Sequence, residues 1–152
     1  MNSLALSDTE IKRLKQRISE INLNQNPVTS EYELLRIKDH KINLILYKTG
    51  KIVFNQNPET EEILSSILQR ETDYDYILGS DETGKGEWYG PLVVVVTALS
   101  PEEIIKLRLS GVKDSKSIKK STIMKLAEKI MKMITYQAIV LKPYTYNELY
   151  SN

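Results

Sequence analysis

The sequence predicts a mixed protein of the α+β or α/β class, with a small α-β-β-β-α domain over residues 1–72 and a second α/β domain over 73–152. Three observations support this prediction. Ser7-Asp8-Thr9-Glu10 has the form of a capping box and precedes an apolar helical repeat. A β-branched run at Val93–Val96 is followed by helical patterns. Between the two halves, the polar stretch 71–76 is typical of a domain boundary.

The first half contains two predicted helices that enclose three predicted strands. Helical spacing of apolar residues predicts a helix over about 8–22, and Asn57-Pro58 is a typical start for a second helix that ends near residue 70. The strands are expected at 32–38, 42–48 and 51–55, with a Thr49-Gly50 turn between the last two. This half contains no cluster of carboxylates, which favours a packing or binding module.

The second half alternates strands with helices. Strands are expected at 76–82, 89–99 and 137–141, with helices at 101–109, at 119–134 and after Pro143. The run Val93–Val96 shows no alternation of polar and apolar residues, so we expect this strand to be buried on both faces.

The composition restricts the kinds of metal site that the chain can build. The 152 residues include no cysteine and one histidine, His40. Disulfides, thiolate sites and histidine clusters are therefore excluded, and any metal must be held mainly by oxygen, which favours Mg²⁺ or Mn²⁺. The absence of cysteine is consistent with a reducing compartment, and no apolar run approaches the roughly 20 residues of a membrane span. We expect a cytoplasmic protein that does not enter a membrane.

Positive charge is concentrated in one part of the chain. From Lys106 to Lys132 there are nine Lys or Arg residues and two acids, although the whole chain has a net charge of only +1. Such an asymmetry indicates a polyanionic partner, and an ordinary solvated face is the alternative.

Two adjacent carboxylates, Asp81 and Glu82, end an apolar strand and precede Gly84-Lys85-Gly86. Neighbouring residues on a strand point to opposite faces, so these two can share one ion only where the strand ends or bulges. Glycines allow such a distortion, and carboxylate oxygens are suitable ligands for Mg²⁺. A solvated hairpin turn is the alternative interpretation.

A second polar cluster contains Asp114, Ser115 and Lys116, within the stretch GVKDSKSI at 111–118. Amides at the start of a helix, a hydroxyl group and ammonium groups together can bind a phosphate. The alternative is an ordinary helix start in which Ser115 or Ser117 is the cap.

Together, GSDETGKGEWYGPLVV at 79–94 and VKDSKSI at 112–118 resemble the type 2 ribonuclease H superfamily. The resemblance is closer to ribonuclease HIII than to ribonuclease HII, because of the acid and aromatic residues before Gly90-Pro91 and because of LKPYTYNELY at 141–150. The hairpin LYKTGKIVF at 46–54 is similar to the TBP-like substrate-binding domain of ribonuclease HIII.

The resemblance implies hydrolysis of the RNA strand of an RNA–DNA hybrid with Mg²⁺ or Mn²⁺, by a ribonuclease H-like domain. It aligns Asp81 and Glu82 with the first two metal-binding catalytic carboxylates. Gly84, Lys85 and Gly86 match the turn that approaches the RNA strand. The motif Asp114-Ser115-Lys116 matches residues associated with phosphate contacts. The TBP-like domain would bind the duplex, with Tyr47, Lys48 and Lys51 of the hairpin as candidates.

This chain departs from the family pattern because two further catalytic acids of the family follow the Tyr-Asn-Glu-Leu segment, and the sequence ends at Asn152. Glu87 and Glu148 match neither of them. We therefore expect that the catalytic domain is incomplete and that its partner is the missing C-terminal half. Apart from that partner, we expect a monomer. The alternatives are a non-catalytic fragment that binds the hybrid, an enzyme similar to ribonuclease HII, and a structural partner of a second polypeptide.

Overall fold

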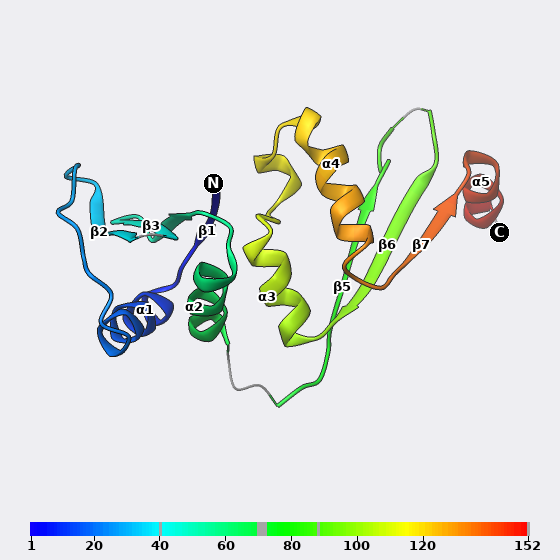
Figure 1. Cartoon of the computed structure of the whole chain (residues 1–152). Helices are drawn as coiled ribbons and strands as arrows, with labels where there is room; N and C mark the ends of the chain where they lie inside the picture. The colour runs from blue at the N-terminus through cyan, green and yellow to red at the C-terminus, as the bar shows by residue number, and fades with distance from the viewer. Residues whose placement is uncertain (40, 70–72, 88, 152) are drawn as a thin grey trace. The chain divides into compact units, whose positions relative to one another are not determined.

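The structure is a computed structural model that describes residues 1–39, 41–69, 73–87 and 89–151. It divides into two compact units, which are drawn in Figure 1. The N-terminal unit comprises 1–71 and 104–119, and the C-terminal unit comprises 72–103 and 120–152. His40, Trp88 and the first two residues of the predicted joint lie outside the described residues. The predicted domain limits at residue 72 therefore stay a prediction.

The N-terminal unit is built on a four-stranded antiparallel sheet. Its strands are β1 (Asn2–Ala5), β2 (Glu33–Asp39), β3 (Ile42–Tyr47) and β4 (Lys51–Phe54), in the order β1-β4-β3-β2. The sequence predicted β2, β3 and β4 but not β1. Strand β1 pairs with β4 from Asn2 opposite Phe54 to Ala5 opposite Lys51. The unit thus gains an edge strand from the first residues of the chain.

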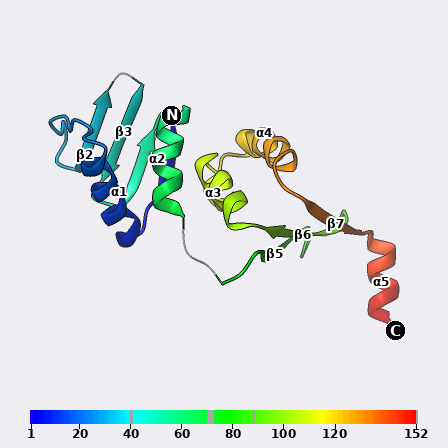
Figure 2. The same ribbon diagram turned by 60° about the horizontal axis from the view of Figure 1, so that its bottom comes forward.

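Two helices, α1 (Asp8–Glu20) and α2 (Pro58–Leu68), lie against one face of this sheet (Figure 2). The predicted capping box of α1 is confirmed, because Ser7 Oγ accepts the Glu10 N–H and Glu10 Oε2 accepts the Ser7 N–H at 2.8 Å. Asn57 caps α2 by a single hydrogen bond, in which its side chain accepts the Thr60 N–H at 2.8 Å. Both helix starts therefore follow from local side-chain hydrogen bonds.

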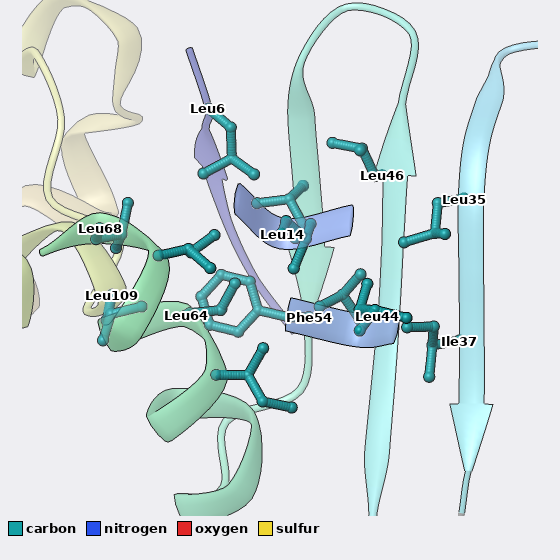
Figure 3. Packing of buried hydrophobic residues seen from close by; sticks show 14 residues of the cluster. Leu6, Leu14, Leu35, Ile37, Leu44, Leu46, Phe54, Leu64, Leu68 and Leu109 are labelled. Atoms are coloured by element: carbon teal, nitrogen blue, oxygen red, sulfur yellow. The ribbon is translucent and has the colours of Figure 1, made fainter. Parts of the chain in front are cut away.

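The core of the N-terminal unit contains residues that alternate along the strands and repeat along the helices. Phe54 of β4, Leu44 of β3 and Leu64 of α2 are almost completely buried, as Figure 3 shows. The opposite face of the sheet carries the intervening residues, including Arg36, Ile45 and Lys51, and is not covered by α1 or α2. One face of the sheet is thus packed and the other is accessible.

The C-terminal unit contains a three-stranded antiparallel sheet, in the order β5 (Ile77–Thr83), β6 (Leu92–Leu99) and β7 (Tyr136–Leu141). The other elements are α4 (Lys120–Met131), α5 (Pro143–Ser151) and the first residues of α3 (Pro101–Leu109). None of the described residues of this unit is buried, and Leu78 on β5 is 76% exposed. The sheet therefore exposes apolar side chains that sheets normally cover.

Two predictions for the strand β6 are wrong. The strand begins at Leu92 rather than at residue 89, because Gly90, with φ of +107°, and Pro91 belong to the preceding turn. Val93–Val96 is not buried on both faces, since Val96 is exposed and the other three are only half-buried. The missing alternation reflects a central strand between two antiparallel neighbours rather than a fully covered one. The mixed α/β class itself is confirmed.

No helix among the described residues has both the length and the apolar character needed to span a bilayer.

Candidate functional site

Asp81 and Glu82 lie near the end of β5, in an unbroken ladder with β6. Asp81 is opposite Val95 and Glu82 is opposite Val94, and the register continues to Thr83 opposite Val93. Because successive residues of a strand face opposite sides of a sheet, this register assigns the two carboxylates to different faces. Both are exposed, and Asp81 Oδ1 accepts the Glu82 N–H at 3.0 Å.

The expected bend that brings the two carboxylates together is therefore not present at residues 81 and 82. The turn begins only at Gly84, after the ladder has ended. Among the described residues, no group of three or more Asp, Glu, His or Cys side chains is placed to hold a metal ion. Two carboxylates on opposite faces do not make up a site for Mg²⁺ or Mn²⁺, so these residues alone do not fit the expected metal.

The glycine turn after β5 has a backbone that only glycine adopts easily. Gly84 and Gly86 have φ of +86° and +81°, and Glu87 N–H donates to Gly84 O at 3.2 Å. A Cβ built on Gly84 would lie 2.3 Å from the carbonyl oxygen of Pro91, whereas a Cβ on Gly86 would meet nothing within 4 Å. Gly84 thus allows the two arms of the turn to approach closely.

Lys85 lies at the tip of this turn. Its side chain is 80% exposed, and Lys85 Nζ lies 3.8 Å from Glu82 Oε1. An exposed pair at this distance contributes little to stability, on the order of 1 kcal/mol or less. The ammonium group is therefore available to a phosphate at a low energetic cost.

A groove of about 400 Å³ lies between the glycine turn and the start of α5. Gly84, Lys85 and Gly86 line one side, and Tyr146 and Asn147 line the other. Sequence reasoning used Tyr146 and Asn147 only as marks of resemblance and did not include them in the site. An aromatic residue next to an amide, one helical turn after the proline that starts α5, is the signal that could have identified them. The groove therefore has the ring of Tyr146 and the amide of Asn147 on one side and Lys85 on the other.

The motif Asp114-Ser115-Lys116 begins a short 3₁₀ helix, η1 (Ser115–Ser117). Asp114 is its cap and accepts the Lys116 N–H through Oδ1 at 2.9 Å, so in the alternative interpretation, an ordinary helix start, the cap is Asp114 and not Ser115. The side chain of Ser117 lies outside the described ones. An aspartate is the better acceptor here because its side chain folds back onto the amide two residues later. Asp114, Ser115 and Lys116 are all exposed.

The predicted site residues are divided between the two units. The C-terminal unit contains Asp81, Glu82 and the turn Gly84-Lys85-Gly86, and the N-terminal unit contains the motif at 114–116. Within the C-terminal unit, the carboxylates and the glycine turn are consecutive, and the groove extends from that turn to α5.

Comparisons with known proteins agree with the motifs. Residues 78–151 match the family model described as Ribonuclease HII. The chain is 29% identical over 160 residues to ribonuclease HIII of Streptococcus pyogenes serotype M4, an alignment that covers 98% of this chain and 52% of that protein. The chain thus spans about half the length of the curated relatives it matches.

Solved structures of similar proteins were also found. RNase H3 of Aquifex aeolicus is 23% identical, with a TM-score of 0.45, over 98% of this chain and 57% of that one. A structure described as Bst-RNase HIII in complex with Mn2+ is 22% identical, with a TM-score of 0.47, over 99% of this chain and 53% of that one. The curated relatives confirm the resemblance to ribonuclease HIII, and the family model supports the wider resemblance through residues 78–151.

Proposed function

We propose, from the relationship of this chain to ribonuclease HIII, that it forms part of an endoribonuclease that hydrolyses the RNA strand of RNA–DNA hybrids. The observation that carries the proposal is the glycine turn beside two exposed carboxylates, within the segment that matches the family model. The proposed cofactor is Mg²⁺ or Mn²⁺, which Asp81 and Glu82 would hold only together with further acidic residues, because these two carboxylates alone do not fit the metal.

The glycine turn and the groove would bind the RNA strand. Gly86 is open, with no atom within 4 Å of where a Cβ would lie, so a sugar-phosphate chain can approach the backbone there, and the neighbouring Lys85 supplies a cation for a phosphate. Asn147 can donate and accept hydrogen bonds, which suits a ribose 2′-hydroxyl, the group that distinguishes RNA from DNA. Tyr146, with its ring 6.3 Å from that of Tyr150, gives the groove an aromatic wall.

The N-terminal unit would bind the duplex through its uncovered sheet face, as a TBP-like domain. The side chains that alternate with the core residues on β2 and β4 include Arg36, Lys38 and Lys51. Tyr47 ends β3, and Lys48 is exposed in the turn that follows. Basic and aromatic side chains on one open face are suited to a phosphate backbone, and such contacts depend on shape more than on sequence.

A second candidate function is hybrid binding without cleavage. The described residues contain no cluster of three metal-binding side chains, and a two-metal site for phosphodiester hydrolysis needs more oxygen ligands than Asp81 and Glu82 provide. The carboxylates of this chain would then become catalytic only together with further acidic residues. Binding through the turn, the groove and the motif at 114–116 does not require them.

Cleavage and binding of a labelled RNA–DNA hybrid distinguish these functions. Cleavage in Mg²⁺ or Mn²⁺ that is lost in Asp81→Ala but retained in Glu128→Ala would support the enzyme, because Glu128 is an exposed acid of the same unit that does not line the groove. Hybrid binding that weakens steeply with salt, without cleavage, would support the second candidate. A chain that neither binds nor cleaves the hybrid would contradict both.

A further inference from the structure

Helix α3 joins the two units of the protein. Its first residues, Pro101–Glu103, belong to the C-terminal unit, and Ser100 and Glu103 form a capping box there, with Ser100 N–H donating to Glu103 Oε2 at 2.8 Å. Residues 104–119, which we call the docked segment, belong to the N-terminal unit. The docked segment contains the end of α3 and the whole motif Asp114-Ser115-Lys116.

Apolar side chains attach the docked segment to the N-terminal core. Leu109 is 6% exposed and belongs to the same cluster as Leu64 and Leu68 of α2, as Figure 3 shows. Ile105 packs against this cluster, and Leu107 is also buried. Such contacts are non-directional, so they attach the helix but do not by themselves determine its orientation.

Directional contacts come from Arg108. Its guanidinium donates to both carboxylate oxygens of Glu10 on α1, at 2.8 Å and 3.2 Å, and to the carbonyl oxygen of Ala5 at 3.0 Å. The Glu10 side chain is only 3% exposed. A two-point contact between a planar guanidinium and a buried carboxylate restricts rotation as well as distance. Asn2 Nδ2 donates to Leu109 O at 2.9 Å next to this pair.

The electrostatic environment of Glu10 agrees with this geometry. Burial on its own would raise the pKa of Glu10, but hydrogen bonds from Arg108 and from the Ser7 N–H outweigh it and lower the pKa to about 2. Glu10 is therefore charged at neutral pH, and it completes two contacts at once: the cap of α1 and the anchor of α3.

Only a few residues separate this anchor from the motif. Helix α3 ends at Leu109, and the chain turns at Gly111, with φ of +84°. In this turn Gly111 N–H donates to Arg108 O at 3.1 Å and Val112 N–H donates to Leu107 O at 3.2 Å. Asp114 follows two residues after Val112 and caps η1. The orientation in which Arg108 holds the end of the helix thus determines where the motif begins.

We propose that Glu10 and Arg108 are positioning residues that hold the Asp114-Ser115-Lys116 motif on the N-terminal unit, so that the motif and the N-terminal sheet bind the hybrid as one body. The inference rests on the proposed function for the phosphate contact of that motif. The N-terminal unit would then bind the duplex and would also orient the phosphate contact of the motif at 114–116, which the sequence assigns to the catalytic domain.

Amide hydrogen exchange of the full chain without substrate tests the anchor. Glu10→Gln keeps an acceptor for the Ser7 N–H, because glutamine also serves in a capping box, but removes the charge that pairs with Arg108. Exchange over residues 110–118 should become about tenfold faster and should accelerate clearly more than exchange in the β2–β3 ladder. The matched control is Glu59→Gln, which removes the exposed Lys41–Glu59 pair of the same unit and should change neither region.

Unchanged exchange over 110–118 in Glu10→Gln would overturn the proposal. Equal acceleration throughout the N-terminal unit would also overturn it, since the pair would then be a general stabiliser. Arg108→Gln should reproduce the local effect, and Glu10→Gln combined with Arg108→Gln should add little to either single change.

Hybrid affinity separates positioning from plain stabilisation. Lys116→Ala should weaken binding in the wild-type chain by about three- to tenfold, and by clearly less in the Glu10→Gln background, because Glu10 acts through the motif. Equal losses in both backgrounds would overturn the positioning role. If Lys116→Ala leaves wild-type affinity unchanged, the phosphate contact assigned to the motif fails, and the exchange experiment still decides whether Glu10 holds the docked segment.

Discussion

Replacing Gly84 and Gly86 separately by alanine tests the geometry of the turn beside the carboxylates. Both residues have positive φ, so alanine costs about 1–2 kcal/mol of backbone strain at either position. Only at Gly84 does the new methyl group meet the protein, 2.3 Å from Pro91 O, far inside the 3.0 Å below which Cβ atoms are essentially never found. Making room for it requires a backbone shift, which typically costs about 1–3 kcal/mol more.

Gly84→Ala should therefore destabilise the β5–β6 ladder by about 1–3 kcal/mol more than Gly86→Ala. Hydrogen exchange measured by NMR at the amides of Thr83 and Val93 reports the opening of this part of the ladder. The energy difference corresponds to exchange that is about 5–150-fold faster in Gly84→Ala than in Gly86→Ala.

Gly86→Ala is the matched control, since it has the same backbone strain and the same change in side chain but an open environment. Equal exchange rates in the two variants would refute the close approach between Gly84 and Pro91. Faster exchange in Gly86→Ala than in Gly84→Ala would show that the turn has a different conformation.

Three further predictions concern stability and binding. The pKa of Glu10 is about 2 in the folded protein and about 4.5 otherwise, so the stability that Glu10 contributes is present above about pH 4.5 and is lost as the pH falls towards 2. The free energy of unfolding measured by urea denaturation should therefore depend less on pH in Glu10→Gln than in the wild-type chain over this range. Leu109→Ala should lower the free energy of unfolding of the N-terminal unit by about 2–5 kcal/mol in urea, whereas Leu34→Ala, at a 39% exposed position, should cost much less. Lys85→Ala should weaken hybrid binding and reduce the slope of log affinity against log salt by about 1, and an unchanged slope would exclude a phosphate contact at Lys85.

Local signals in the sequence predicted much of the N-terminal unit. The capping box at Ser7, the proline after Asn57 and the alternation along β2 and β3 each act over a few residues, and the structure contains the elements that they predict. Strand β1 was missed because four residues, Asn2–Ala5, carry no periodicity and become a strand only by pairing with β4. Such pairing is a tertiary effect that propensity does not record.

The candidate site was predicted less completely than the fold. The motifs indicated Asp81, Glu82 and the glycine turn. The two carboxylates lie on opposite faces because β5 stays paired with β6 as far as Thr83, and the sequence does not specify where this pairing ends. Tyr146 joins the groove through packing of α5 rather than through a pattern. The docking of α3 through Arg108 depends on contacts with residues about a hundred positions earlier, which no local signal reports.

The uncovered C-terminal sheet separates the proposed site of this chain from the part that supplies most of its folding stability. The buried apolar side chains lie in the N-terminal unit, whereas Asp81, Glu82 and the glycine turn lie where none of the described residues is buried. Random substitutions should therefore divide into two classes. Those in the N-terminal core will reduce the yield of folded protein, and those around β5 will leave most of the folding energy intact while changing the surface proposed to bind the hybrid.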